Sequence, residues 1–359
     1  MSRASEPSRR DIILVGGSAG SIDALLQILP TLPPDFAASF FIVVHTPADG
    51  PGLLPRIIRR ATALPTVHPA DGDNIRPGHI YVAPPNRHLT LAAGGVIHVS
   101  KGARENGHRP AIDPLFRTAA IHGYAPRAIA VILSGYLDDG SAGLYAVRSR
   151  GGVSIIQDPK DAIADPMPGK ALQYAGADFV LPARNIGAAL AELVGSTGKV
   201  IAMKDRDVNP KHGSAAKSSE DEGKDEITSH RVAAYPGEGG GMPSVFACPD
   251  CHGVLWEIKE GGSVRYRCRV GHAYSEATLS DELSQAAESA LWAAMRALDE
   301  KAGMARRMAD AAAGPEQWTN RLREQAETYA DQADMLRKMI LGEPPVAAAV
   351  VPESRDEAS

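Results

Sequence analysis

The stretch that decides the fold is DIILVGGSAGSIDALLQILP, residues 11–30. An apolar run, Ile12 to Val15, leads into a glycine-rich corner, and a helical pattern follows the corner. A strand that turns directly into a helix is typical of a parallel α/β sheet. The corner sets Ser18 between Gly17 and Gly20, where a serine can help cradle a phosphate, act as a nucleophile or cap the helix.

Strand-like and helical patterns continue to alternate over residues 10–197. We therefore expect a doubly wound, largely parallel, Rossmann-like α/β sheet with helices on both faces. Gly94 and Gly95 predict a hairpin turn within HLTLAAGGVIHVS, because glycine readily adopts positive φ. The expected strands are DIILVG, SFFIVVH, HIYVAPP, AIAVILSG, GVSIIQD and DFVLP. The expected helices include SIDALLQIL, GLLPRIIRRATAL, DPLFRTAAIHG, GLYAVRSR and GKALQYAG.

The composition of the 359 residues narrows the class of protein. A formal net charge of −5 leaves no basic excess for binding nucleic acid or a membrane surface. No apolar run is long enough to span a membrane, and the apolar segment near the N-terminus is too short for a signal peptide. Without export, disulfides are not expected among the 3 cysteines, so we expect a cytoplasmic protein.

The composition changes after the α/β region. Residues 202–244 are charged, small and poor in large apolar side chains, which predicts a flexible linker. A compact cysteine-bearing segment follows at 245–274. Residues 275–341 carry apolar side chains at 4-3 spacing on two stretches that break at Gly314-Pro315, which predicts a helical hairpin or coiled coil. Residues 344–359 are expected to be disordered.

The glycine corner matches one catalytic pattern and excludes two others. A dinucleotide fingerprint requires glycines where Ser18 or Ala19 stands, and a phosphate-binding Walker loop requires a lysine that is missing. Residues 16–20 do fit G-x-S-x-G, in which small neighbours leave a serine hydroxyl exposed on a strand-to-helix turn. The alternative is a tight turn in which Ser18 only caps the helix.

A serine nucleophile needs a base and a carboxylate that orients it. His45 ends the apolar run SFFIVVH, and Asp138 and Asp139 follow the run AIAVILSG. In a parallel sheet the carboxyl ends of strands share one edge, so these side chains are expected beside Ser18. Taken alone, His45 could be a loop residue and Asp-Asp-Gly a simple turn.

Several blocks of the chain, in order, resemble the catalytic domain of the chemotaxis receptor protein-glutamate methylesterases, the CheB family. The blocks are VGGSAGSIDAL, IVVHTP, DGDNIRPGHIYVAPPNRHLTL, GHRPAIDPLFRTAA, AVILSGYLDDGSAGLYAV and DPMPGKAL. The resemblance implies that Ser18 is the nucleophile, His45 the base and Asp139, rather than Asp138, the orienting acid. It also implies a doubly wound sheet and a catalytic domain that needs no cofactor.

The reaction implied is hydrolysis of γ-glutamyl methyl esters on the cytoplasmic helices of methylated chemoreceptors, with glutamine deamidation as a related activity. Backbone amides near Ala19 and Tyr136 are the expected oxyanion donors.

The chain departs from the family pattern at Ala19, where a threonine is usual, and at Ser21, where a glycine is usual. Asp138 replaces a neutral amide and is expected to add charge beside Asp139, which could perturb His45. We also expect no receiver domain before the catalytic domain, because the chain leaves no room for one.

A second site is expected at Cys248, Cys251, Cys268 and His272. A C-x₂-C pair followed by a second pair of ligands across a hairpin is the spacing typical of zinc sites. Four protein ligands indicate a structural ion rather than a catalytic one, because a catalytic ion keeps an open position. A zinc-ribbon-like module this small would need the metal to stay folded. His252 is an alternative fourth ligand, although it directly follows Cys251.

The first hypothesis is therefore a cytoplasmic serine carboxylic-ester hydrolase that acts on methylated receptors, with a zinc module and helices that dock a partner or a second copy. One alternative is a degenerate esterase domain that serves as a signalling scaffold. The other is a serine hydrolase for a different ester or amide.

Overall fold

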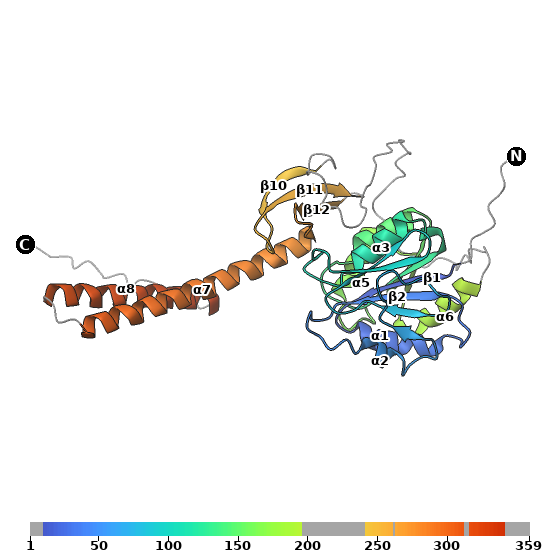
Figure 1. The fold of residues 1–359 in the computed structure, drawn as a ribbon, viewed down its shortest axis with the longest axis horizontal. Helices are drawn as coiled ribbons and strands as arrows, with labels where there is room; N and C mark the ends of the chain where they lie inside the picture. Colours follow the sequence, from blue (N-terminus) through green and yellow to red (C-terminus); the bar gives the residue numbers. More distant parts are fainter. Residues whose placement is uncertain (1–9, 196–240, 261–262, 312–315, 342–359) are drawn as a thin grey trace, which may run out of the picture. The chain divides into compact units, whose positions relative to one another are not determined.

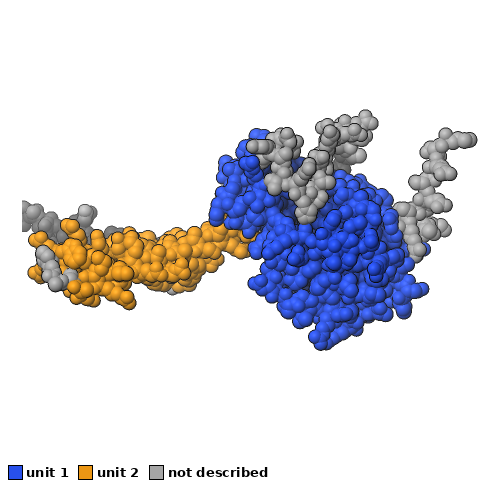
Figure 2. Space-filling model, viewed as in Figure 1, with its two compact units in different colours: residues 1–279 blue, residues 280–359 orange. Residues whose placement is uncertain are grey.

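The computed structural model describes residues 10–195, 241–260, 263–311 and 316–341. It divides into two compact units, residues 1–279 and 280–359 (Figure 2). Of the linker predicted over 202–244, residues 202–240 lie outside the described residues, and residues 242–244 belong to a strand; the tail predicted at 344–359 also lies outside the described residues. No helix of the described part is long and apolar enough to cross a membrane.

A seven-stranded sheet with every described pairing parallel forms the centre of the first unit (Figure 1). Its order is β3-β4-β2-β1-β7-β8-β9, so the chain starts in the middle with β1, adds β2, the edge strand β3 and then β4 on one side, and runs outward through β7, β8 and β9 on the other. This is the predicted doubly wound sheet. The strands are β1 (Ile12–Gly17), β2 (Ser39–Val44), β3 (Thr66–Val67), β4 (Ile80–Val82), β7 (Ala128–Ile132), β8 (Val153–Gln157) and β9 (Phe179–Leu181).

Helices cover both faces of the sheet, because side chains that alternate along a strand must be buried on both sides. Ile12 and Leu14 of β1 join the apolar cluster of one face, and Ile13 and Val15 join that of the other. The first face packs α3 (Ile112–Ile121), α4 (Ser141–Ser149) and α5 (Pro166–Ala175). The second packs α1 (Ser21–Ile28), α2 (Leu54–Ile58) and α6 (Ala183–Gly195).

The described structure differs from the expected elements in three places, one of which is the short strand β3, which was not predicted. The helix expected over GLLPRIIRRATAL shrinks to α2, which ends before the exposed Arg59 and Arg60. Helix α6 was not predicted. The hairpin β5 (His88–Ala92) and β6 (Val96–Ser100) is confirmed, with positive φ at Gly94 and Gly95.

An antiparallel sheet of four strands, in chain order, carries the cysteines. We call residues 242–275 the cysteine module. Its first strand begins before the boundary predicted at residue 245, since the apolar Met242 already pairs with Glu257. The strands are β10 (Met242–Ala247), β11 (Val254–Glu260), β12 (Ser263–Cys268) and β13 (Ala273–Ser275).

The expected helical pair is present as α7 (Glu276–Ala311) and α8 (Glu316–Leu341). The two helices run antiparallel, because Asp299 pairs with Arg337 at 3.1 Å while Lys301 lies 4.1 Å from the ring centre of Tyr329. Small side chains let them approach closely, and Ala302 and Ala333 are buried between them. The predicted break at Gly314-Pro315 lies outside the described residues.

Substituting Gly16→Ala should destabilise the full chain by about 1–3 kcal/mol, because overpacking a core strains its neighbours. A Cβ at Gly16 would come within 2.3 Å of Cγ2 of Ile112, whose side chain is fully buried and cannot move aside. The measurement is thermal or denaturant unfolding. The control is Gly169→Ala in α5, where a Cβ meets nothing within 4 Å and alanine favours helix. Gly169→Ala should leave stability unchanged or raise it, and an equal loss in both variants would contradict the packing argument.

Candidate active site

The carboxyl ends of β1, β2 and β7 bring the predicted serine and histidine to one edge of the sheet. Gly17 pairs with Val44 in register, and the N–H of His45 donates to the Gly17 carbonyl at 3.1 Å. The N–H of Ser18 donates to the Ser134 carbonyl at 2.9 Å, which ties the corner to the turn after β7. The structure therefore brings together the three turns that the sequence placed at this edge.

The corner is built from glycines because larger residues would collide. A Cβ at Gly17 would lie 2.4 Å from Cβ of Ser21, and a Cβ at Gly135 would lie 2.9 Å from Cβ of Ser18. Gly20, at φ 77°, occupies the N-cap of α1, and no side chain caps this helix. The alternative that Ser18 serves as a helix cap is therefore wrong.

His45 and Asp139 form a buried hydrogen-bonded pair. The Nε2–H of His45 donates to Oδ2 of Asp139 at 2.8 Å, and their side chains are 5% and 1% exposed. The carboxylate can only accept, which fixes the tautomer with its proton on Nε2. The other ring nitrogen, Nδ1, is buried and has no hydrogen-bond partner among the described residues. His45 therefore keeps a free acceptor atom, and its backbone N–H is bonded to the serine corner at Gly17.

Asp139 is held by donors on both oxygens. Oδ2 also accepts the N–H of Ile112 at 2.6 Å, so Asp139 lies at the positive N-terminus of α3. Oδ1 accepts from Nδ2 of Asn106 at 2.9 Å and from the N–H of Asp113 at 3.2 Å. Burial would raise the pKa of Asp139, but the hydrogen bonds from His45, Ile112 and Asn106 outweigh it and lower the pKa below its usual range. The carboxylate is thus kept ionised beside the imidazole.

Asn106, Asp113 and His108 belong to this site but were assigned no role from the sequence. Nδ2 of Asn106 bridges Asp139 and Asp113, which it reaches at 3.2 Å. Burial and the nearby charge of Asp139 raise the pKa of Asp113, which also accepts the N–H of Gly143 at 2.7 Å. The one available signal was their position in and beside the block GHRPAIDPLFRTAA. Which of its polar residues turn toward Asp139 depends on how the loop folds back.

His108 stacks on His45, with ring centres 3.7 Å apart and ring planes 22° apart. Burial, together with His45 and Arg104, lowers the pKa of His108 from 6.5 to about 4. A neutral ring therefore covers His45 at neutral pH and limits its rotation.

The remaining predicted residues lie at the same edge. Ala19 follows Ser18 in the corner, where its carbonyl accepts the Ser134 hydroxyl at 2.7 Å. Tyr136 lies on the turn after β7 and is 62% exposed. A surface hollow lined by Asp11, Ser39 and Arg127 lies at the opposite edge, near the amino ends of the strands, so it does not serve this site.

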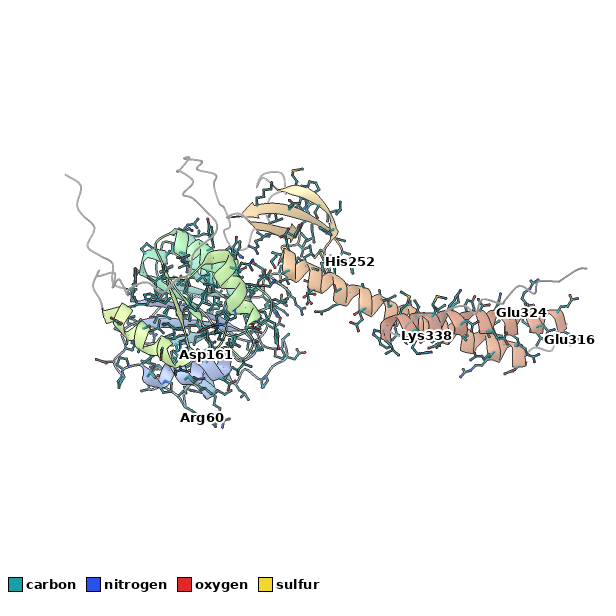
Figure 3. All side chains as sticks on the ribbon, turned by 180° about the vertical axis from the view of Figure 1, so that it is seen from behind. Arg60, Asp161, His252, Glu316, Glu324 and Lys338 are labelled. Carbon is teal, nitrogen blue, oxygen red and sulfur yellow. The ribbon has the colours of Figure 1, made fainter. Side chains whose placement is uncertain are left out.

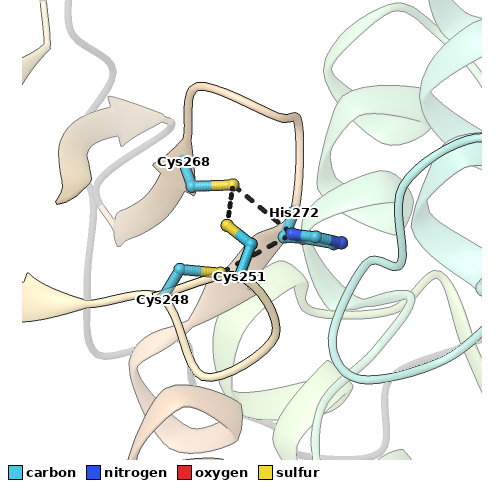
Figure 4. A group of neighbouring side chains, drawn as sticks. All are labelled: Cys248, Cys251, Cys268 and His272. Atoms are coloured by element: carbon cyan, nitrogen blue, oxygen red, sulfur yellow. Dashed lines mark hydrogen bonds between the residues drawn. The ribbon is translucent and has the colours of Figure 1, made fainter. Parts of the chain in front are cut away.

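The four predicted metal ligands converge in the cysteine module (Figure 4). Sγ of Cys251 lies 3.6 Å from Sγ of Cys268, and Nδ1 of His272 lies 3.6 Å from Sγ of Cys248 and 3.5 Å from Sγ of Cys268. All three thiols are free, and four ligand atoms lie within 4.8 Å of one another. Tetrahedral zinc with ordinary bond lengths separates its ligands by about 3.5–3.8 Å, and the three distances between ligand atoms given above lie in this range.

A shell of hydrogen bonds surrounds this cluster. The hydroxyl of the buried Tyr274 donates to Asp250 at 2.6 Å and lies 3.5 Å from Sγ of Cys248. Such outer partners orient metal ligands. His252, the alternative ligand, is exposed and is not one of the four clustered residues; it is labelled in Figure 3.

A doubly wound α/β sheet with a serine corner and a buried His–Asp pair at its carboxyl edge is an arrangement that suits an acyl-transferring hydrolase. The CheB methylesterase family model matches residues 13–190, which include Ser18, His45 and Asp139. The chain belongs to the CheB methylesterase family, whose members are carboxylic-ester hydrolases. The cysteine module and the helical pair lie outside the matched residues.

Individual relatives agree with this family. A Leptospira interrogans protein, provisionally named protein-glutamate methylesterase/protein-glutamine glutaminase, is 38% identical over 176 residues, covering 49% of this chain and 91% of the relative. A Moorella thermoacetica protein of the same name is 37% identical over 199 residues, covering 54% of this chain and 47% of the relative. The Thermotoga maritima CheB methylesterase catalytic domain, a crystal structure, is 33% identical with a TM-score of 0.49, covering 52% of this chain and 100% of that domain.

The lowered pKa of His108 has a consequence for stability. The unfolded chain binds a proton at His108 near pH 6.5, whereas the folded chain does so only near pH 4, so stability falls as pH drops between these values. Substituting His108→Phe keeps a ring on His45 and removes this loss, worth at most roughly 3 kcal/mol. Melting temperatures between pH 8 and 4 should therefore fall less steeply in the variant. A fall in melting temperature toward pH 4 that is as steep in the variant as in wild type would contradict the expectation.

Proposed function

We propose that Ser18, His45 and Asp139 form a catalytic triad that hydrolyses γ-glutamyl methyl esters on chemoreceptor-like proteins, and deamidates glutamine by the same route. The observation that carries the proposal is the buried His45–Asp139 hydrogen bond, which leaves Nδ1 of His45 unpartnered at the serine corner. Membership of the family and the names of the relatives support the substrate class.

Acylation begins when Nδ1 of His45 takes the proton of the Ser18 hydroxyl while Oγ attacks the ester carbonyl. Asp139 stabilises the resulting imidazolium through Nε2, and its own lowered pKa keeps it from taking the proton. Collapse of the tetrahedral intermediate breaks the bond to the methoxy oxygen. Methanol then leaves with the proton from His45. A glutamine side chain would lose ammonia at the same step.

Water completes the reaction by attacking the glutamyl-enzyme, with His45 again accepting a proton, and the attack returns Ser18 and a free glutamate. The amides of Ala19 and Tyr136 are the proposed donors to the oxyanion, since they lie on the two turns that flank Ser18. The hydrolysis draws on no metal in this scheme. We place the reaction in the cytoplasm, where the methylated helices of such receptors lie.

Zinc is the metal proposed for the cysteine cluster. Three thiolates and one imidazole suit zinc, and four protein ligands leave no open position for a substrate. Met242 and Val245 of the first strand are 73% and 94% exposed, so these apolar side chains do not contribute to a core. A module with a small core depends on a bound metal to stay folded, which supports a structural role for the zinc ion. The exposed Met304, Met335 and Met339 of α7 and α8 support the proposal that the helical pair docks a partner or a second copy.

Substituting Ser18→Ala should abolish methanol release from methylated receptor membranes, with a loss of about 10⁴- to 10⁶-fold, because the nucleophile is removed. Ser149→Ala, an equivalent change at the end of α4, is the control and should keep wild-type activity. A fluorophosphonate probe should label wild type and Ser149→Ala but not Ser18→Ala. A wild type that neither releases methanol nor reacts with the probe would favour the scaffold alternative. Probe reaction without methanol release would favour a different substrate.

Purified protein should contain about one zinc ion per chain by elemental analysis. Cys268→Ser should lose most of this zinc and lower the melting temperature of the module, because three ligands hold the ion more weakly than four. His252→Asn is the matched control, since asparagine tolerates the φ of 58° at this position, and it should retain the metal. Zinc lost equally in both variants, or absent from wild type, would contradict the ligand assignment.

A further inference from the structure

Strand β13, at the edge of the cysteine module, pairs with residues 104–108, a loop of the α/β domain (residues 10–195), which we call the catalytic domain. The N–H of Asn106 donates to the Ala273 carbonyl at 2.7 Å, and the N–H of Ala273 donates to the Arg104 carbonyl at 3.3 Å. The resulting bridge between Glu105 and Ala273 is parallel. The 104–108 loop therefore extends the sheet of the module beyond β13, and its backbone depends on that strand.

Buried charges fix the same loop from both sides. Glu105 accepts hydrogen bonds from Arg117 of α3 and, at 2.9 Å, from Arg265 of β12. The three side chains are only 9–16% exposed. Burial would raise the pKa of Glu105, but the two guanidinium groups lower it well below its usual range. One ionised carboxylate thus joins the catalytic domain to the module.

The module also contacts two residues next to Asp139, namely Asn106, which donates to its carboxylate, and Asp138, which precedes it in the chain. The N–H of Ser275 donates to Oδ1 of Asn106 at 3.0 Å, while Nδ2 of the same side chain donates to Asp139. Oδ1 of Asp138 accepts from the hydroxyls of Ser275 at 2.7 Å and Thr278 at 3.1 Å. These hydroxyls, one from the end of β13 and one from the first turn of α7, hold the carboxylate of Asp138 in place.

The strand that makes these contacts, β13, begins directly after His272 of the cysteine cluster. His272 precedes Ala273, and its carbonyl accepts the N–H of Cys268 at 2.9 Å. Tyr274, between the two residues that hold the loop, reaches the cluster through Cys248. The module buries only a few apolar side chains, among them Leu255, Tyr266 and Tyr274, so we expect its four ligands, together with the pairing to β12, to keep β13 in place.

We propose that the metal-bound cysteine module is a positioning element for the triad: through Ala273 and Ser275 it holds residues 104–108, and so keeps Asn106 on Asp139 and His108 on His45. Metal loading and esterase turnover are then coupled. The part of this inference that concerns esterase turnover rests on the proposed function. Ser275 acts through Asn106 and Asp138, so it is a positioning residue, and its loss should lower kcat more than it raises KM.

The first experiment removes zinc from the full chain with a chelator and follows amide hydrogen exchange and turnover together. Exchange should accelerate at Asn106, Ile112 and Asp113 as well as in β13, while β1 and β2 stay protected. kcat should fall by about 10- to 100-fold, the range seen when outer hydrogen-bond partners are lost, with little change in KM. Adding zinc back should restore both. Unchanged exchange at residues 104–108 would overturn the proposal. A rise in kcat would also overturn it, because the module would then obstruct the active site instead of positioning its residues.

The second experiment breaks the connection while leaving the cluster intact. Glu105→Gln removes the charge between Arg117 and Arg265, so zinc content should stay at wild-type level while kcat falls and the 104–108 loop exchanges faster. Glu257→Gln, on β11 of the module, is the matched control and should change none of these. Wild-type kcat and loop exchange in Glu105→Gln would count against the proposal.

Hydrogen exchange separates failure of this inference from failure of the proposed function. If wild type releases no methanol, the methylesterase proposal fails, yet metal-dependent protection of Asn106 and Ile112 still supports the coupling. If methanol is released at a rate independent of zinc, the esterase proposal holds and the coupling is wrong.

Discussion

The structure of the active site depends on the burial of one carboxylate, Asp139. An ionised carboxylate at 1% exposure must be surrounded by donors, because burying an unpaired charge is too costly for a fold that is stable by only a few kcal/mol. Here the donors come from His45 after β2, from the first amides of α3 and from Asn106. Satisfying this single group fixes the strand edge, the helix start and the 104–108 loop relative to one another.

The same constraint explains why the site extends beyond the residues that would touch substrate. Asn106 can serve Asp139 only while its loop stays folded, and that loop has a positive φ of 50° at Asn106 and a tight turn between Glu105 and His108. A strand edge and a buried ion pair from the cysteine module hold it there. The cysteine module thus contacts the loop that holds Asn106 on Asp139, and Asp138, a departure from the family pattern, is one of its contact points.

Local chemistry explains why some features could be predicted from residues alone. Gly94-Gly95 predicted the hairpin because the turn needs positive φ. The metal cluster could be predicted because the ligands of a zinc site lie close together in the sequence: Cys248, Cys251, Cys268 and His272. The expected helix after Gly52 failed beyond Ile58, where exposed arginines offer no apolar face to bury. Helix α6 was missed although its buried Ile186 and Leu190 pack against the sheet.

The sequence by itself determined the parallel sheet, the serine corner and the edge at which His45 and Asp139 lie, because strand order along the chain and apolar alternation place these residues without knowledge of distant contacts. Only the tertiary structure decided that Asn106 contacts Asp139 and His108 stacks on His45, that Gly20 rather than Ser18 occupies the helix cap, and that β13 pairs with the 104–108 loop. The reason is physical: these contacts join residues far apart in the chain, and a loop takes the conformation that its remote partners can satisfy.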